Sequence, residues 1–411
     1  MHYIYLGATF VCSVSMEKKD PIVPEFADRL QNIDDYAEIV EVVTSPDFVQ
    51  DGAPARRVFL DDTPMCAEGK RHAQLKRMFQ DIVSREAIAY YERQLLRPVI
   101  DETLSVLMKE ASADGIVRTD LISFTQTVLH KISAGVTGVD GIDTPERCDR
   151  FRNLLAALGK GIAAHFATGD IDQAVEQAKA DLQTLVDEFL QASLDRRREL
   201  ALAYHAGSIE KADLPRDALM MLCLENDLER AADDERVPYI WRQAAIFLSA
   251  SVQTTTHTFP HVVVHIDEWV NAHPEDRAKL LDNDFLHAAV AEALRLHQTA
   301  PVRLRTARSD VTLSTGRIVA EGEMVALWAP HANMDATIFG EDARYFNPYR
   351  PRSEGEMVSI LRALYQHGCR LDPDRPLVRN RESFHDTFES VPILLKKIAY
   401  GDGPLDPPWG W

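Results

Sequence analysis

The sequence predicts a mainly α-helical protein with a small β part, built as one large domain. Between about residues 36 and 300, apolar side chains recur three and four positions apart and Gly and Pro are scarce, which is the pattern of amphipathic helices. After Pro301 the pattern changes to short stretches of alternating apolar and polar residues, which is typical of strands. No internal repeat, low-complexity tract or linker divides the 411 residues, so we expect one domain although the length alone would allow two or three.

The expected helices occupy most of the first 300 residues. Each is recognised by an apolar stripe, such as the one formed by Leu75, Phe79 and Ile82. Pro260 is expected to break or kink its helix, because proline cannot donate the helical hydrogen bond. The charged run at residues 195–199 is expected to be a solvated helix face. The expected helical segments are residues 36–43, two helices within 71–110, and residues 120–136, 174–202, 241–258 and 284–296.

The expected β part is a small meander that comes after the last of these helices. Thr315-Gly316 has the composition of a tight turn between two alternating segments, and residues 321–323 have that of a second turn before an apolar strand. Beyond residue 336 the chain is rich in Pro, Asp and Arg, and its periodicity is weak. The expected strands are residues 302–306, 310–314, 317–320 and 324–329.

The formal net charge of -19 argues against two classes of partner. Lys and Arg total 45 against 64 Asp and Glu, and such a chain repels phosphate backbones and anionic lipid headgroups. Apolar residues make up 45% of the chain, which is enough to bury a sizeable core. We therefore expect a globular protein with no nucleic-acid or membrane partner.

The cysteines indicate a reducing compartment. Their number is odd and no CxxC spacing occurs, unlike the disulfide scaffolds of secreted proteins, so a cytoplasmic location is expected. The apolar stretch at residues 3–16 is too short to span a bilayer, and no Lys or Arg precedes it. We expect residues 1–20 to be an extension outside the core and residues 21–411 to form the domain. The five cysteines are Cys12, Cys66, Cys148, Cys223 and Cys369.

Glu292 and Arg295 lie three apart in an expected helix and can pair on one of its faces, which by itself is a common surface arrangement. The order of the segments after this helix is more informative: a hairpin, an apolar strand, residues 332–335 and then residues 339–348. In this order the chain resembles the heme-thiolate monooxygenases of the cytochrome P450 family. The resemblance implies a P450-like domain with a buried triad of Glu292, Arg295 and a later arginine, for which Arg344 is expected.

The resemblance extends to four basic residues that would face the propionates of a heme. His72 and Lys76 are four apart, so they share one helix face and can approach a single anion together. Arg305 matches a third propionate contact of the family, and Arg370 matches a fourth. Without the resemblance, His72 and Lys76 would be interpreted as exposed polar residues of an amphipathic helix. The resemblance thus implies heme b as the cofactor.

Part of the helix expected at residues 241–258 resembles the oxygen-activating segment of the family. Ala250 would leave room above the iron, and Thr254 would relay protons to bound oxygen. Gln253 stands where the family has an acid, and an amide cannot supply a titratable proton. The hydroxyl of Thr254 could instead bond back to the preceding helical turn, so both interpretations stay open.

The iron-ligand loop is where the chain departs most from the family pattern, Phe-Gly-x-Gly-x-His/Arg-x-Cys-x-Gly, whose Cys thiolate binds the iron. The best match is residues 365–374, with residues 375–379 as the helix after the loop. In this register Asp372 stands at the ligand position and Cys369 lies three residues early. A carboxylate is a hard ligand without the electron push of a thiolate. The other candidate iron donors are Cys369, His367 and Tyr365.

One function that these residues allow is a heme protein of altered ligation. It would be an oxidoreductase of the monooxygenase or peroxygenase type, acting on a small organic substrate such as a natural product. Segments near residues 46–67 and 150–175 would shape the substrate pocket. Turnover of dioxygen would need a separate ferredoxin or flavoprotein donor, because the chain has no flavin or nicotinamide fingerprint.

The alternative function is that of a heme-free relative. Such a protein would be a partner or activator of another biosynthetic enzyme, or would catalyse a redox-neutral step in the emptied pocket. Some P450-family members of natural-product pathways lack the ligand and activate glycosyltransferases, so the resemblance permits this function. A decayed protein without a binding role is a third interpretation.

Overall fold

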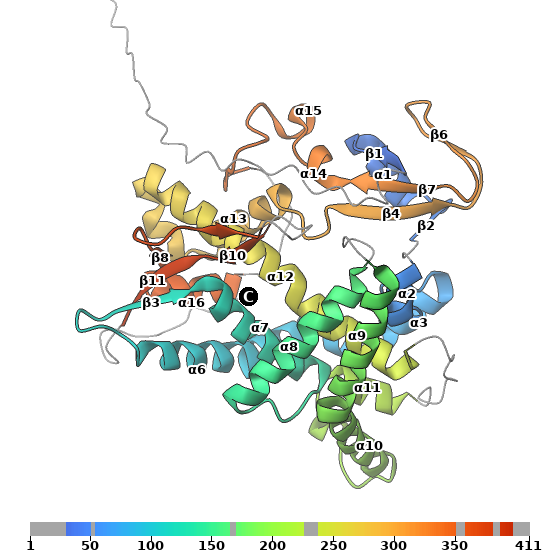
Figure 1. Ribbon diagram of the computed structural model, residues 1–411, viewed down its shortest axis with the longest axis horizontal. Helices are drawn as coiled ribbons and strands as arrows, with labels where there is room; N and C mark the ends of the chain where they lie inside the picture. The colour runs from blue at the N-terminus through green and yellow to red at the C-terminus, as the bar shows by residue number, and fades with distance from the viewer. Residues whose placement is uncertain are drawn as a thin grey trace, which may run out of the picture.

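Helices make up most of the structure and the strands are few and short, which confirms the predicted mainly α fold with a small β part (Figure 1). The computed structural model describes residues 30–50, 54–164, 170–225, 237–350, 358–380 and 387–397. The expected boundary between residues 20 and 21 lies outside the described residues. Within the described ranges, no helix has both the length and the apolar composition needed to cross a membrane.

Several helices begin at a capping carboxylate. Asp120 accepts hydrogen bonds from two amides in the first turn of α7, and Asp282 does the same for α13. The helices of the first half are α1 (Tyr36–Thr44), α2 (Pro54–Leu60), α3 (Gly69–Met78), α4 (Gln80–Val83), α5 (Arg85–Tyr91), η2 (Glu92–Leu96), α6 (Arg97–Met108), α7 (Leu121–Thr137), α8 (Pro145–Ile162), α9 (Ile171–Leu185), η4 (Val186–Leu190) and α10 (Gln191–His205). The later ones are η5 (Lys211–Asp213), α11 (Ala218–Leu224), α12 (Tyr239–Ala272), η6 (Pro274–Leu281), α13 (Asn283–Leu296), α14 (Ala329–Ala332), α15 (Ala336–Phe339) and α16 (Val358–Gln366).

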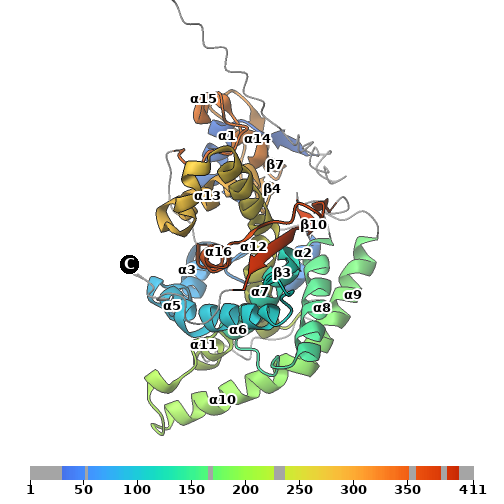
Figure 2. The ribbon, with the colours of Figure 1, turned by 90° about the vertical axis from the view of Figure 1, so that its left-hand side faces the viewer.

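The 34-residue helix α12 runs through the middle of the molecule, beside α7 and α8 (Figures 1 and 2). The helix was expected to span residues 241–258 and to break or kink at Pro260; it does not break there, since it continues to Ala272. Pro260 is buried, and packing against α7 and α13 holds the helix where proline removes one hydrogen bond. Leu248 belongs to one large apolar cluster and Phe259 to another, so α12 joins the two cores.

The strands of the described residues pair in small sheets. The sheet β1-β7-β4-β2 lies near α1 and α14, and the sheet β3-β11-β8 lies at the opposite side of Figure 1. β5 and β6 form the predicted hairpin, which turns at Gly316 with φ of +90°. The strands are β1 (Gln31–Ile33), β2 (Phe48–Val49), β3 (Ile116–Asp120), β4 (Val302–Ala307), β5 (Val311–Thr312), β6 (Ile318–Val319), β7 (Met324–Trp328), β8 (Arg370–Leu371), β9 (Val378–Arg379), β10 (Phe388–Ser390) and β11 (Pro392–Lys396).

One residue of the charged run at residues 195–199 is buried. Arg197 points inward from α10, donates to Asp217 at 2.9 Å from Nη2 and also pairs with Asp140. Its neighbours in the run, such as Asp195, remain exposed, so the prediction of a solvated face is wrong for Arg197 alone. Burial raises the pKa of Asp217, although Arg197 acts in the opposite direction. The ion pair joins α10 to the start of α11.

The substitution Asp217→Ala is expected to lower the free energy of unfolding by about 3–5 kcal/mol, because it leaves the Arg197 guanidinium buried beside only Asp140. It also removes the N-cap of α11, where Asp217 accepts from the Met220 amide. The matched control is Asp195→Ala, an exposed carboxylate paired with Arg198, which should cost less than about 0.5 kcal/mol. Urea unfolding of the two variants measures the difference. Equal stability losses would contradict the buried role of Arg197.

Candidate functional site

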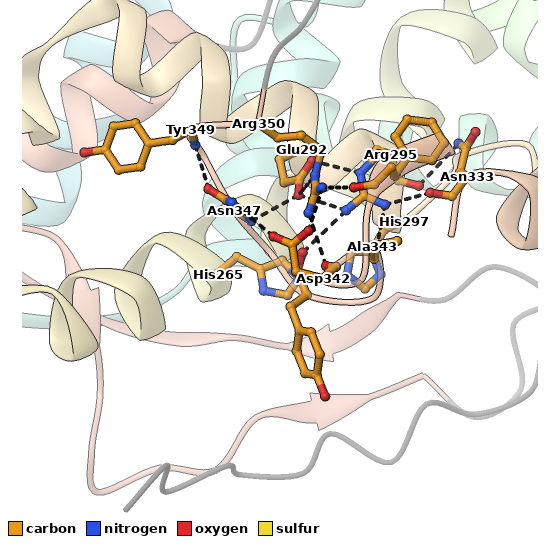
Figure 3. A network of polar contacts seen from close by, with 12 residues as sticks. His265, Glu292, Arg295, His297, Asn333, Asp342, Ala343, Asn347, Tyr349 and Arg350 are labelled. Carbon is orange, nitrogen blue, oxygen red and sulfur yellow. Dashed lines mark hydrogen bonds and ion pairs between the residues drawn. The ribbon is translucent and has the colours of Figure 1, made fainter. Parts of the chain in front are cut away.

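A buried carboxylate, Glu292, lies at the centre of the polar network in Figure 3. It projects from α13 and its side chain has no exposed surface. Arg295 donates to both carboxylate oxygens, at 2.9 Å from Nε and 2.8 Å from Nη2. Arg350 donates to it from Nε at 3.1 Å. A fully desolvated carboxylate requires such partners, because an unpaired buried charge is very costly.

The third member of this triad is Arg350, and the prediction of Arg344 is wrong. The side chain of Arg344 is exposed. Arg350 instead bonds both Glu292 and Asp342, the latter at 2.9 Å. The backbone amide of Asn347 also donates to Glu292, at 3.0 Å, so the chain turns over the carboxylate after residue 344 and brings residue 350 onto it. The weak periodicity of this segment contains no signal that would separate the two arginines.

The same network gathers the segments that come after the meander. Arg295 donates to the carbonyls of Asn333 and Ala343, both at 2.6 Å. The Tyr349 hydroxyl donates to Asp276 at 2.6 Å, and this hydrogen bond is the main reason that the pKa of Asp276 falls to about 2. Charged and polar contacts therefore hold α13, η6 and residues 332–350 together. Figure 3 shows part of these contacts.

Three of the four expected propionate contacts come from neighbouring elements. His72 and Lys76 are exposed on α3, and their side chains make no hydrogen bond or ion pair with any described residue. Glu68, the N-cap residue of α3, pairs with Arg308 directly after β4, so the start of α3 lies beside that strand. Arg305 of β4 is half-buried, and burial together with the nearby Arg303 lowers its pKa.

Arg370 lies apart from this set. It is exposed in β8, which pairs with β11, and β11 pairs with β3. Figure 1 shows this sheet on the left of the molecule, whereas α3 and β4 lie on the right. The prediction that Arg370 joins the other three basic residues is wrong, because residues 370 and 371 form a strand instead of a loop.

The expected iron donors around Cys369 are enclosed or engaged elsewhere. Cys369 comes after α16 and packs in the apolar cluster that contains Ile393 and Leu364. Burial raises the pKa of its thiol, and Asp267 raises it further, so the thiolate is disfavoured. Tyr365 is buried in the same cluster, and His367 Nδ1 lies 3.2 Å from the carbonyl of Lys396. None of these three groups has the environment of an activated ligand.

Asp372, at the expected ligand position, serves the local fold. Its side chain is fully buried and accepts hydrogen bonds from Arg375 Nε at 2.7 Å and from the Asp374 amide at 3.0 Å. Burial alone would raise the pKa of Asp372, but these donors and Arg118 hold it below its ordinary value. Arg375 also donates to the carbonyl of Thr119 in β3, at 2.8 Å. Through Arg375, the Asp372 carboxylate therefore holds residues 372–375 against strand β3.

The predicted helix at residues 375–379 is absent. This part of the chain is a turn and then strand β9, which pairs with β10. The helix of this region is α16, and it precedes Cys369 instead of coming after it. The predicted register of the iron-ligand loop is therefore wrong as a whole.

The expected oxygen-activating residues line the middle of α12. Ala250 and Thr254 are exposed there, and the Thr254 hydroxyl donates to the carbonyl of Ala250 at 3.0 Å. This is the back-bonding geometry that satisfies a hydroxyl within its own helix. Gln253 lies against Gly159 of α8, where a Cβ would fall on its side-chain amide. α8 therefore approaches α12 closely at the position where the family has an acid.

The segment expected to shape a substrate pocket packs against α12 and α8. Phe59 and Leu60 of α2 are fully buried in this core. Just after them, the carbonyl of Asp62 accepts from the Gln243 amide of α12 at 2.6 Å. α2 thus packs apolar side chains against one side of the first half of α12.

Comparison with known proteins places this arrangement in a family. A family model described as Cytochrome P450 matches residues 261–362, which contain α13 and the Glu292 network. This part of the chain is similar to the cytochrome P450 family. A curated relative, the probable cytochrome P450 313a1 of Drosophila melanogaster, is 32% identical over 65 residues, which are 16% of this chain and 13% of that relative.

Solved P450 structures share the fold over nearly the whole chain at low identity. CYP109E1 from Bacillus megaterium in complex with testosterone has 15% identity and a TM-score of 0.63, with 93% of this chain and 98% of that chain covered. A mutant of P450 EryK in complex with erythromycin B has 18% identity, a TM-score of 0.64, and coverages of 94% and 96%. P450BioI in complex with a ligated acyl carrier protein has 14% identity and a TM-score of 0.64, with 89% of this chain and 92% of that chain covered.

This chain does not present a residue set that fits an iron-bound heme. Lys76 and Arg305 have the charge, and His72 has the ring N–H donor, that propionates need, but the candidate iron donors are a buried thiol and an engaged carboxylate. These residues therefore support no chemical step through a heme.

A histidine cluster was not expected from the sequence. His265 of α12 lies with its Nε2 2.8 Å from Nε2 of His297, which comes directly after α13, and His261 stacks on His297 with ring centroids 3.6 Å apart. The four-residue spacing of His261 and His265 is the signal that could have found it. The cluster links α12 to the helix that carries Glu292.

The triad is tested by two arginine substitutions of the same kind. Arg350→Ala is expected to lower the free energy of unfolding by about 3–5 kcal/mol, because it leaves the desolvated Glu292 carboxylate short of one partner. Arg344→Ala removes an exposed side chain and should change stability by less than about 0.5 kcal/mol. Chemical unfolding of both variants gives the comparison. A larger loss for Arg344→Ala would restore the sequence-based assignment.

Acid unfolding is expected to report on Asp372. Its folded-state pKa lies below the unfolded value of about 3.9, so its contribution to stability is fully present above about pH 4 and is lost as the pH falls through the folded pKa. Asp372→Asn should therefore be less stable than the native chain at neutral pH and should approach it in acid. Urea midpoints from pH 7 to pH 2.5 provide the measurement. A difference that does not shrink in acid would show that the carboxylate is not ion-paired.

Proposed function

We propose that this chain is a heme-free P450 homologue that acts as a protein partner of another biosynthetic enzyme. The observation that carries the proposal is the state of the two expected iron ligands. Cys369 is a buried thiol whose pKa is raised, and the Asp372 carboxylate is bound by Arg375 and the Asp374 amide. Without an iron ligand, the P450 fold can contribute binding surface but no oxygen activation.

Two observations on α12 favour a binding role over oxygen activation. Gln253 stands where the family has an acid, its side chain packs on Gly159, and an amide supplies no titratable proton. The Thr254 hydroxyl donates to the carbonyl of Ala250 in its own helix.

The class of partner is inferred from the family resemblance. Some family members in natural-product pathways lack the ligand and activate glycosyltransferases. Among the solved neighbours, EryK is in complex with erythromycin B and HmtN is a post-tailoring hydroxylase of himastatin biosynthesis. We extend this context to the chain and propose a cytoplasmic enzyme of natural-product assembly as its partner.

The alternative is a heme protein of altered ligation, with an electron donor such as a ferredoxin or flavoprotein. The exposed His72 and Lys76 beside the half-buried Arg305 favour it, because these charges would suit two propionates. The alternative requires a donor to the iron that none of the expected residues supplies.

Protein expressed with added heme precursor separates the two functions. The native chain is expected to purify without a Soret band and with negligible heme in the pyridine hemochrome assay, because it offers no iron ligand. The Cys369→Ala variant, which changes one expected donor, should give the same result. Stoichiometric heme in the native protein would refute the proposal, and its loss in Cys369→Ala would assign the ligand.

The partner role has its own test. Cross-linking in the native host, with identification and purification of the linked enzyme, supplies the candidate partner. Its activity is expected to rise on addition of equimolar native chain, with or without heme in the medium. A partner enzyme that is fully active and stable alone would contradict the role.

A further inference from the structure

The junction between the Glu292 network and α16 is short. Arg350 completes the network, and α16 begins at Val358, so seven residues join them. The sequence of this junction is Pro-Arg-Ser-Glu-Gly-Glu-Met, which contains no Cys, His or Tyr. The iron-ligand motif of the family has ten positions, so the junction is both too short for it and without a donor to iron.

α16 has the packing of a core helix. Its residues Ile360, Leu361 and Leu364 are buried, and the helix contacts α13, α6 and η6. After α16 the chain enters β8, which pairs with β11 in the sheet with β3. In the family the triad arginine is followed by the iron-ligand loop and then by a helix. In this chain that helix is α16, so the loop would lie before α16.

We infer that this chain lacks the whole iron-ligand loop, which is missing between Arg350 and Val358, and that the ligand was not lost by substitution at Asp372. Asp372 and Cys369 lie beyond α16, where they serve the sheet and the apolar core. No change of side chain at either position can then place a donor on the iron, because the backbone that should carry it is absent. The missing loop would explain why the proposed function is heme-free. It rests on the proposed function in one respect, that the chain binds no heme.

Loop insertion at two places tests the inference. One protein receives the ten-residue family motif between Arg350 and Val358, and a second receives the same motif in place of residues 365–374. Their matched controls have alanine instead of the motif's cysteine. The first protein is expected to bind heme at least about tenfold more tightly than its alanine control and to show the thiolate-type band of the reduced carbon monoxide complex. The second should bind no more heme than the native chain.

Heme binding by the second protein and not by the first would overturn the inference. Because an inserted chain can fail to fold, the single substitution Asp372→Cys is measured in parallel. It should leave heme binding at the native level. A new Soret band with the thiolate-type carbon monoxide spectrum in Asp372→Cys would also overturn the inference, while a colourless native chain would leave the proposed function in place. Heme in the native chain that persists in Cys369→Ala and in Asp372→Ala would refute the proposed function but not the missing loop.

Discussion

The fold of this protein depends on keeping one buried carboxylate paired. Glu292 has no exposed surface, and Arg295 and Arg350 donate to it from α13 and from the far end of the segment after the meander. Because the desolvated carboxylate accepts hydrogen bonds from both arginines, loss of either one leaves it with fewer donors, so the pairing holds the two segments together. The same arginines bind the carbonyls of Asn333, Ala343 and Asp342, so the pairing also orders the backbone around them.

The periodicity of apolar residues predicted the fold class, whereas local sequence patterns predicted only part of the candidate site. The helical stripes and the hairpin at Gly316 were recognisable because each is a local signal. The continuation of α12 through Pro260 was not, because tertiary packing overrides the propensity of one residue. Arg344 and Arg350 are six residues apart in a segment without periodicity, and only the burial of Glu292 distinguishes them. The predicted register of the iron-ligand loop was wrong because the segment around Cys369 was aligned with that loop. In the structure helix α16 comes before Cys369, whereas the family's helix follows the loop.

The polar network around Glu292 is complete, and the Asp372 carboxylate at the expected ligand position is engaged in the local fold. The charges on α3 and β4 persist beside each other, α12 exposes Ala250 and Thr254, and α2 and α8 close on the other side of this helix. The carboxylate at residue 372 stabilises a sheet, so its presence there has a structural reason that needs no metal. Such a protein keeps a large, ordered surface, which is what a partner of another enzyme needs.

The purified native chain is expected to have no site for iron-bound heme. A titration with hemin, monitored by the Soret absorbance and by quenching of tryptophan fluorescence, measures whether such a site exists. We predict a weak, unsaturable signal that is unchanged in Cys369→Ala, because neither this thiol nor the Asp372 carboxylate is available to the metal. Saturation at one heme per chain, with a sharp Soret band that Cys369→Ala abolishes, would contradict this expectation.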